Sequence, residues 1–236
     1  MSAAAALKVS GLRSGYGEAL VTRDVSFDVR SGEIFALLGK NGMGKSTLLK
    51  TVMGFLPVEG GTVELFGTDV TGMAPHKVAR RSIAYTPQEQ ALFQDLTVEQ
   101  NLRLGLRDDK LFAPGVERIG TVFPFLPGRL QQRAGTLSGG EQKMLLVARA
   151  LMPQPKLMLI DEISEGLQPS VIERLANVLR EQRDEANVSM LLIEQNVKFA
   201  LSVADRYAVL KLGEIVDRGE AGSAGIERRI TDQLSV

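Results

Sequence analysis

The chain has 236 residues, of which 44% are hydrophobic and 24% charged, and its 28 basic and 28 acidic residues give a formal net charge of zero. This length supports one large core, and the neutral balance does not favour nucleic acid or an anionic membrane as a partner. The absence of cysteine excludes disulfides, thiol catalysis and cysteine-bound zinc.

The start of the chain, MSAAAALKVSG, lacks the basic segment and apolar core of a signal peptide. No apolar run reaches the roughly 20 residues that cross a bilayer. We therefore expect a soluble, cytoplasmic protein, for which any work at a membrane would need a partner.

The predicted elements change in character along the chain. Short β patterns with glycine turns fill the first third, with a helix expected from Ser46 to about Gly54. Helical periodicity dominates from about 96 to 151, and strand–helix alternation then returns, with helices expected over 170–184 and 197–204. A Gly/Ala/Ser tail at 219–225 is the one linker-like segment. These patterns predict a single α/β domain with an antiparallel β portion near the N-terminus and a helical subdomain at about 96–151.

The strongest motif is GKNGMGKST, which follows the apolar strand IFALL and opens a helix. Glycines let such a loop curl so that backbone N–H groups face phosphate oxygens, and the helix N-terminus adds favourable partial charge. Lys45 should reach the outer phosphates and the Ser46 hydroxyl should coordinate Mg²⁺. The alternative, a chance match to a glycine-rich turn, does not explain the strand–loop–helix context. The predicted phosphate-binding residues are Gly39, Lys40, Asn41, Gly42, Met43, Gly44, Lys45, Ser46 and Thr47.

The segment KLMLIDE is an apolar run that ends on two acids. It predicts a buried parallel strand whose carboxyl end brings charge to a cleft. Asp161 would then hold Mg²⁺, and Glu162 would polarise an attacking water. Many strands end in solvent with the same pattern, so this interpretation depends on the phosphate loop upstream.

The segment LSGGEQ opens a further helix, in which Ser138 and Glu141 have the spacing of a capping box. One interpretation is simply a well-capped helix. The other is a second anion site at the helix N-terminus, made by the Ser138 hydroxyl, Gly139 and Gly140. In that interpretation the predicted ATP-binding residues of this segment are Ser138, Gly139, Gly140 and Glu141.

The ordered set of these motifs resembles the ATP-binding cassette (ABC) ATPases over nearly the whole chain. The resemblance implies a P-loop NTPase (RecA-like) core, ATP and Mg²⁺ as cofactors, and two cassettes head to tail, each LSGGEQ helix closing over the partner's ATP. It implies that Tyr16 stacks on adenine, that Gln88 senses Mg²⁺ and faces the membrane subunits, and that Ser164–Leu167 crosses the dimer interface. Considered alone, Tyr16 would be an exposed loop aromatic and Gln88 a polar residue at a strand end.

The apolar strand SMLLI ends on Glu194, Gln195 and Asn196, where the family usually carries a switch histidine that contacts the γ-phosphate. We expect Gln195 to take that position and the polar trio to face the nucleotide. The alternative is that Gln195 only caps the helix that follows Asn196. The single histidine, His76, follows Pro75 at the start of a short helix and is expected at the surface.

The Glu-Gln-Asn trio, SEGLQPS and SIAYTPQEQALFQDLTVEQNL resemble one of the two ATPase subunits of branched-chain (hydrophobic) amino acid importers, a group whose relatives move urea and short amides. This implies an ATP-hydrolysing subunit with Glu162 and Gln195 as catalytic residues and Ser46, Gln88 and Asp161 around Mg²⁺. Ile163 departs from the family, which usually has proline after the two acids.

The implied partners are a second ABC ATPase subunit, different or identical, membrane permease subunits and, indirectly, a periplasmic substrate-binding protein. The chain would then lie on the cytoplasmic face of the inner membrane. One rival is a nucleotide-gated clamp that hydrolyses ATP poorly, against which the retained Glu162 argues. Another is an ABC-type ATPase that acts on nucleic acid or ribosomes, which usually needs coiled coils, two cassettes or zinc-binding cysteines.

Overall fold

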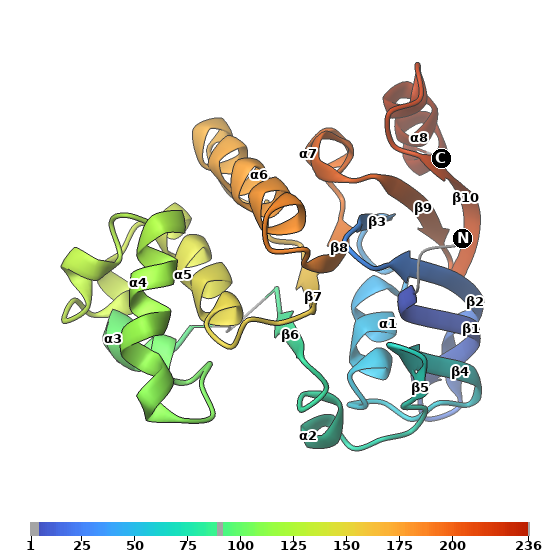
Figure 1. The fold of residues 1–236 in the computed structure, drawn as a ribbon. Helices are drawn as coiled ribbons and strands as arrows, with labels where there is room; N and C mark the ends of the chain where they lie inside the picture. The colour runs from blue at the N-terminus through green and yellow to red at the C-terminus, as the bar shows by residue number, and fades with distance from the viewer. Residues whose placement is uncertain (1–4, 89–91, 236) are drawn as a thin grey trace.

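The computed structural model describes residues 5–88 and 92–235, which form two β-sheets with helices around them (Figure 1). The antiparallel sheet has, in spatial order, the strands β2 (Ala19–Arg30), β1 (Ala5–Tyr16), β4 (Gly60–Leu65) and β5 (Thr68–Asp69). The central sheet has the order β10 (Glu214–Glu220), β9 (Arg206–Lys211), β3 (Ile34–Leu38), β8 (Ser189–Glu194), β7 (Leu157–Asp161) and β6 (Ile83–Thr86). All neighbours in the central sheet are parallel except β10 and β9.

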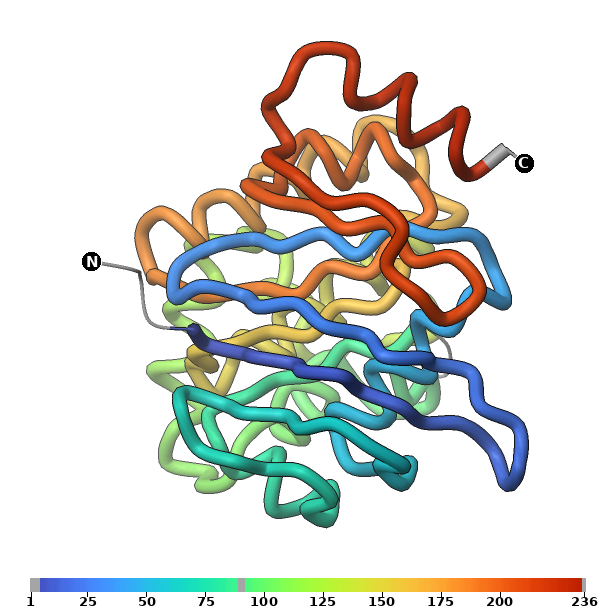
Figure 2. The backbone as a smooth tube through the Cα atoms, turned by 90° about the vertical axis from the view of Figure 1, so that its right-hand side faces the viewer, coloured from blue at the N-terminus to red at the C-terminus, as the bar shows by residue number. Residues whose placement is uncertain are grey.

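The two sheets differ in how their residues are buried, and this follows from the sequence of each strand. In β2, Val25, Phe27 and Val29 are buried whereas the residues between them are more exposed, as in a sheet with one solvated face. Figure 2 shows this sheet lying across the face of the molecule. β3, β7 and β8 are buried at every position, because the central sheet is covered on both faces.

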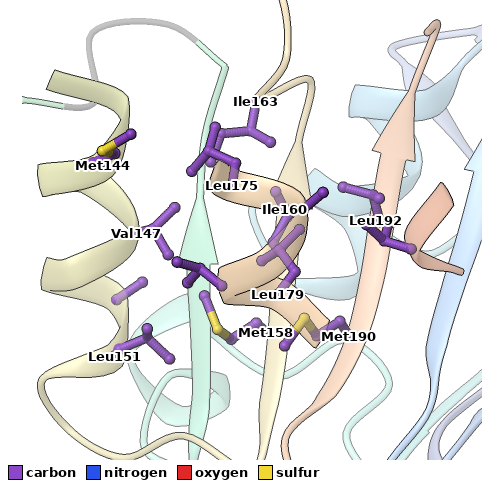
Figure 3. Packing of buried hydrophobic residues seen from close by; sticks show 14 of the residues in the cluster. Met144, Val147, Leu151, Met158, Ile160, Ile163, Leu175, Leu179, Met190 and Leu192 are labelled. Carbon is purple, nitrogen blue, oxygen red and sulfur yellow. The ribbon is translucent and has the colours of Figure 1, made fainter. Parts of the chain in front are cut away.

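The central sheet separates two hydrophobic cores, and alternate residues of its strands belong to different cores. Phe35 and Leu37 of β3 pack with helix α1 (Lys45–Val52) and the antiparallel sheet. Ile34 and Ala36 face the opposite core, where α5 (Gly139–Leu151) and α6 (Pro169–Asp184) cover the sheet. Figure 3 shows this second core, in which the labelled residues are Met144, Val147, Leu151, Met158, Ile160, Ile163, Leu175, Leu179, Met190 and Leu192.

The remaining helices flank these layers. α3 (Val98–Arg103), α4 (Phe112–Val122) and α5 gather on one side of the central sheet (Figure 1). Three 3-10 turns, Asp109–Leu111, Pro127–Arg129 and Ala134–Thr136, lie within the same stretch. The others are α2 (Pro75–Val78), α7 (Val197–Val203) and α8 (Ile226–Ser235). None of the helices in the described ranges has the length and apolar character that a bilayer crossing requires.

The structure confirms the predicted fold class, including the antiparallel β portion and the helical insertion between β6 and β7. α1, α6 and α7 begin and end within one or two residues of the predicted bounds, and exposed His76 lies in the short helix α2. The expectation of a tail at 219–225 is wrong, since residues 219 and 220 belong to β10. The unpredicted helix α8 follows and packs its buried Ile230 into the core.

Candidate functional site

The phosphate loop lies between the carboxyl end of β3 and the start of α1, as its sequence predicts. Gly42 and Gly44 have φ angles of 81° and 99°, a conformation that glycine adopts without steric cost. Gly44 is the N-cap of α1, and no side chain accepts a hydrogen bond from the first turn of this helix. The unpaired N–H groups and the helix dipole therefore favour an anion at this point.

Lys45 and Glu162 form a buried ion pair at the centre of the site. Lys45 Nζ lies 2.9 Å from Glu162 Oε1, and each side chain is only 3% exposed. The same Nζ donates to the carbonyl oxygen of Lys40 in the loop at 2.8 Å. Each of these two buried charges is compensated by the other. The ion pair also joins the phosphate loop to the end of β7.

The second oxygen of Glu162 accepts two further hydrogen bonds, both from glutamine amides. Gln88 Nε2, beyond the end of β6, and Gln195 Nε2, beyond the end of β8, each lie 2.8 Å from Oε2. Gln195 Nε2 also donates to Asn41 Oδ1 of the phosphate loop at 2.7 Å. Glu162 thus brings together segments that follow four parallel strands, whose carboxyl ends meet at one edge of the sheet.

The backbone of Glu162 is itself unusual. Its φ of 47° lies in the left-handed region, which costs a non-glycine residue about 1–2 kcal/mol. Its N–H donates to Ile193 O at 2.9 Å, so β8 holds this residue in place. The following residue, Ile163, is buried in the core beside Leu175 (Figure 3), and it does not impose the restriction that proline places on a preceding residue.

Asp161 is buried at the end of β7, next to Glu162. Burial, together with the charge of Glu162, raises its pKa to about 6, while a hydrogen bond from the Ser46 hydroxyl and the charges of Lys45 and Lys50 oppose this rise. Its Oδ1 atom has no hydrogen-bond partner in the structure. A buried carboxylate oxygen without a partner, next to a serine hydroxyl, suits a hard cation such as Mg²⁺.

No group of three or more His, Cys, Asp or Glu side chains in the described ranges could hold a metal ion by itself. This agrees with Mg²⁺, which is usually bound by one or two carboxylates together with substrate phosphates and water. Asp161 and Ser46 therefore fit the ion as part of a nucleotide complex.

The hairpin of β1 and β2, which carries Tyr16, reaches the phosphate loop. A Cβ atom added to Gly44 would lie 3.2 Å from Val21 Cγ1, so this part of β2 contacts the loop directly. Tyr16 itself is 51% exposed at the end of β1, where it pairs with Ala19. Its ring is therefore open to a ligand, on a hairpin that adjoins the phosphate loop.

A family model described as ABC transporter matches residues 22–165, which is more than half of the chain. The chain belongs to the ABC transporter family.

Relatives within this family are similar over most of their length. The chain is 42% identical over 210 residues to the high-affinity branched-chain amino acid transport ATP-binding protein BraG of Pseudomonas aeruginosa, covering 87% of this chain and 90% of that protein. It is 36% identical over 217 residues to the probable branched-chain amino acid transport ATP-binding protein LivF of Archaeoglobus fulgidus, covering 91% and 92%. A solved nucleotide-free ATP-binding cassette of an ABC transporter superimposes with a TM-score of 0.87 at 26% identity, covering 97% of this chain and 96% of the other.

In this ABC transporter subunit the LSGGEQ segment forms the capping box that its sequence predicts. Ser138 Oγ accepts from the N–H of Glu141 at 3.3 Å, and Glu141 Oε2 accepts from the N–H of Ser138 at 3.0 Å. Glu141 also pairs with Arg129 at 2.8 Å. A Cβ on Gly140 would lie 2.9 Å from Val171 Cγ2, so any larger residue would require Val171 to shift where α5 approaches α6.

The structure does not bring this segment to the chain's own phosphate loop. No contact described within 5–88 and 92–235 joins Ser138, Gly139, Gly140 or Glu141 to residues 39–47. Further along α5, Lys143 Nζ donates to Gln88 O at 3.4 Å, which joins this helix to the segment after β6. In the described ranges the LSGGEQ segment and the phosphate loop are therefore separate.

The polar trio at the end of β8 does not act as a unit, and the expectation that all three residues face the nucleotide is wrong. Gln195 alone reaches the Glu162 cluster. Asn196 is the N-cap of α7, with its Oδ1 accepting from Phe199 N at 3.1 Å, so the capping role considered for Gln195 belongs to Asn196. Glu194 is buried on the other side of the strand end, against Ser164. The pattern of the sequence held no signal for this contact.

Proposed function

We propose that this chain hydrolyses ATP as the nucleotide-binding subunit of an importer for branched-chain amino acids. The observation that carries the proposal is the Glu162 carboxylate, held among Lys45, Gln88 and Gln195 beside the open N-terminus of α1. The similarity to BraG and LivF, both named for branched-chain amino acid transport, supports the substrate class.

The ion pair of Lys45 and Glu162 suggests how the site responds to ATP. Phosphate groups at the N-terminus of α1 would compete for the Lys45 ammonium, which is 2.9 Å from Glu162 Oε1. Once Lys45 turns to the phosphates, Glu162 Oε1 is free to accept a hydrogen bond from the attacking water. Gln88 and Gln195 hold Oε2 meanwhile, so the carboxylate stays oriented. Orientation and charge stabilisation of this kind supply most of the catalysis in phosphoryl transfer.

We assign the metal to Asp161, Ser46 and Gln88. When bound, Mg²⁺ neutralises charge on the phosphate oxygens. The chain's contribution is to hold the ion at the end of β7, where the free Oδ1 of Asp161 lies. Tyr16 would stack on adenine, since its hairpin adjoins the phosphate loop.

A second ABC ATPase subunit would complete the site. The capped but otherwise free start of α5 offers Ser138, Gly139 and Gly140 to a phosphate group, and it lies away from the phosphate loop of the same chain (Figure 1). Association head to tail with a partner cassette, identical or different, would place this helix over the partner's nucleotide.

A groove of about 660 Å³ between the β6 region and α3 is proposed as the docking surface for a permease subunit. Phe93, Leu104 and Leu111 line it, and each is about half exposed or more. Exposed apolar side chains gathered in one groove indicate a protein partner. Gln88, whose amide donates to Glu162 Oε2, precedes Phe93 by a short stretch of sequence, so we expect a partner in this groove to influence that hydrogen bond. Through this contact the chain would sit on the cytoplasmic face of the membrane.

The proposal is tested by reconstituting the chain with its permease subunits and binding protein in liposomes. Wild type should hydrolyse ATP and take up labelled leucine, whereas Glu162→Gln should bind ATP and lose roughly 10²–10⁴-fold in turnover. Uptake of urea or acetamide in place of leucine would assign the chain to the amide branch of these importers. ATP binding by wild type without hydrolysis would refute the enzymatic part and leave a nucleotide-gated clamp.

A further inference from the structure

Strand β8 ends on an ionisable side chain that the proposed reaction does not use. Glu194 is 2% exposed and follows five buried residues of the same strand. Burial raises its pKa above the usual value, and hydrogen bonds from Ser164 oppose the rise. Glu194 has no ion pair within the described part of the chain. A buried carboxyl group of this kind is costly unless hydrogen bonds satisfy it, so its contacts indicate why it is tolerated.

The carboxyl group of Glu194 is held by two segments of the site. Ser164 donates twice, from its N–H to Oε1 at 3.0 Å and from its hydroxyl to Oε2 at 2.8 Å. The N–H of Gln195 donates to Oε2 at 3.3 Å. In addition, the backbone carbonyl of Glu194 accepts from the N–H of Gly39 at 3.2 Å. One residue therefore contacts the phosphate loop, the loop after Glu162 and the Gln195 segment.

These contacts bear directly on Glu162, which lies two residues before Ser164. The left-handed backbone at Glu162 persists only where its surroundings fix it. β8 fixes it on both sides: Glu162 N donates to Ile193 O at 2.9 Å, and Ser164 is held by Glu194. If the second attachment were lost, the chain at Glu162 could relax towards a more common backbone conformation and carry its carboxylate away.

Glu194 also influences the position of the Gln195 amide, which faces Glu162 from the other side. Gln195 follows Glu194 directly, and its side chain bonds to Glu162 Oε2 and to Asn41 Oδ1. The contacts thus close a ring that runs from Glu162 through Ser164, Glu194 and Gln195 back to Glu162. A change in any residue of this ring should therefore shift the other residues.

We propose that Glu194 is a positioning residue. It keeps the side chains of Glu162 and Gln195 correctly placed relative to each other, because it binds Ser164 and the backbone N–H of Gln195 at the same time. The inference rests on the proposed role of Glu162 in hydrolysis. Glu194 itself is only 2% exposed, so we do not expect it to contact the nucleotide or the attacking water. Glu194 affects the reaction through Ser164 and Gln195, the two residues that it binds. The exposed residues that follow Ser164 should move when Glu194 moves.

The test compares Glu194→Ala, Glu194→Gln and Ser164→Ala in the assembled transporter, with two matched controls. Ser189→Ala removes a buried hydroxyl at the opposite end of β8, and Glu33→Gln changes a buried glutamate at the opposite edge of the sheet. Glu194→Ala should lower kcat at least about tenfold while KM for ATP changes less than about threefold, because small misplacements of reacting groups are costly. Glu194→Gln should keep more activity, since its amide can still accept from Ser164 N and donate to Ser164 Oγ.

A purely structural role would lower Tm without this pattern, so two further measurements separate the cases. In the Gln195→Ala background the effect of Glu194→Ala on kcat should shrink, because residues that act through one another are not additive. Hydrogen exchange should rise in Glu194→Ala at both 162–167 and 195–197, and in neither segment in Ser189→Ala.

Unchanged exchange in Glu194→Ala, or full additivity with Gln195→Ala, would overturn the inference. If Glu194→Ala does not fold, Ser164→Ala and Glu194→Gln carry the same comparisons. If hydrogen exchange rises in the variants but wild type does not hydrolyse ATP, the link from Glu194 to Glu162 and Gln195 is upheld and the proposed function is refuted.

Discussion

Replacing Asp161 by asparagine should stabilise the nucleotide-free protein at neutral pH while weakening its binding of Mg-ATP. Asp161 is 3% exposed, and burial, the largest cause, raises its pKa from 3.8 to about 6. Because the pKa is higher in the folded chain than in the unfolded one, the folded state binds the proton more tightly. The free energy of unfolding therefore falls as pH rises from about 4 to about 6.

The size of the effect follows from the shift in pKa. Each pKa unit corresponds to about 1.4 kcal/mol, so the move from 3.8 to about 6 gives about 3 kcal/mol. Above pH 6 wild type lacks this stabilisation, whereas asparagine keeps the shape of the neutral side chain and does not ionise. The variant should consequently be about 3 kcal/mol more stable than wild type at pH 7.5 and similar to it near pH 4.

The assay is denaturant unfolding of both proteins without nucleotide at pH 4.5, 6 and 7.5, with Asp232→Asn as an exposed control. Calorimetric titration then measures the affinity for Mg-ATP. The variant should bind Mg-ATP more weakly, because it has lost the carboxylate that would coordinate Mg²⁺. Parallel unfolding curves for wild type and Asp161→Asn across this pH range would refute the reasoning, because they would show that Asp161 is ionised at no cost.

Further variants at four positions test other contacts. Lys45→Ala should lose tight Mg-ATP binding, because the loop keeps its amide groups but not the ammonium, and wild-type affinity in a titration would contradict the site. Glu162→Gln should lower the unfolding free energy of the nucleotide-free protein by about 3 kcal/mol, because Lys45 is left buried opposite a neutral group, and Mg-ATP should restore it. Gln195→Ala should slow hydrolysis more than it weakens ATP binding, and Gln195→His should be tolerated because a ring nitrogen can donate; an unchanged kcat in Gln195→Ala would remove its role. Thr97→Ala should cost about 1 kcal/mol in denaturation by removing the cap of α3, with ATP affinity as the control that stays constant.

The placement of Lys45 and Asp161 could be predicted because an apolar strand precedes the loop that leads to Lys45 and another apolar run ends on Asp161. Parallel strands of this kind bring their carboxyl ends to one edge, so residues just beyond them meet. The ion pair between Lys45 and Glu162 could not be predicted. It depends on the order of β3, β8 and β7 in the sheet and on a left-handed backbone at Glu162, and neither is written in a local pattern.

The errors have equally specific causes. Side chains alternate along a strand, so Glu194 and Gln195 point to different sides, and a polar trio has no single direction. Helix α8 was missed because the small residues at 219–225 suggested a tail, while the helix itself carries few apolar residues, of which Ile226 and Ile230 are buried. Motif residues carry local information, whereas the contacts of Glu194 arise only from the folded chain.

The position of β3 in the central sheet has a consequence for synthesis of the protein. β3 is paired on one side with β8 and on the other with β9, the two strands made shortly before the end of the chain. Roughly 150 residues separate β3 from β8, so a ribosome working at about 5–20 residues per second needs roughly 8 to 30 s to supply the first neighbour. Throughout that interval the apolar strand IFALL has no partner in its own sheet. A nascent chain that stops before residue 189 would carry the phosphate loop without the sheet that supports it, and we expect such fragments to need a chaperone rather than to bind nucleotide.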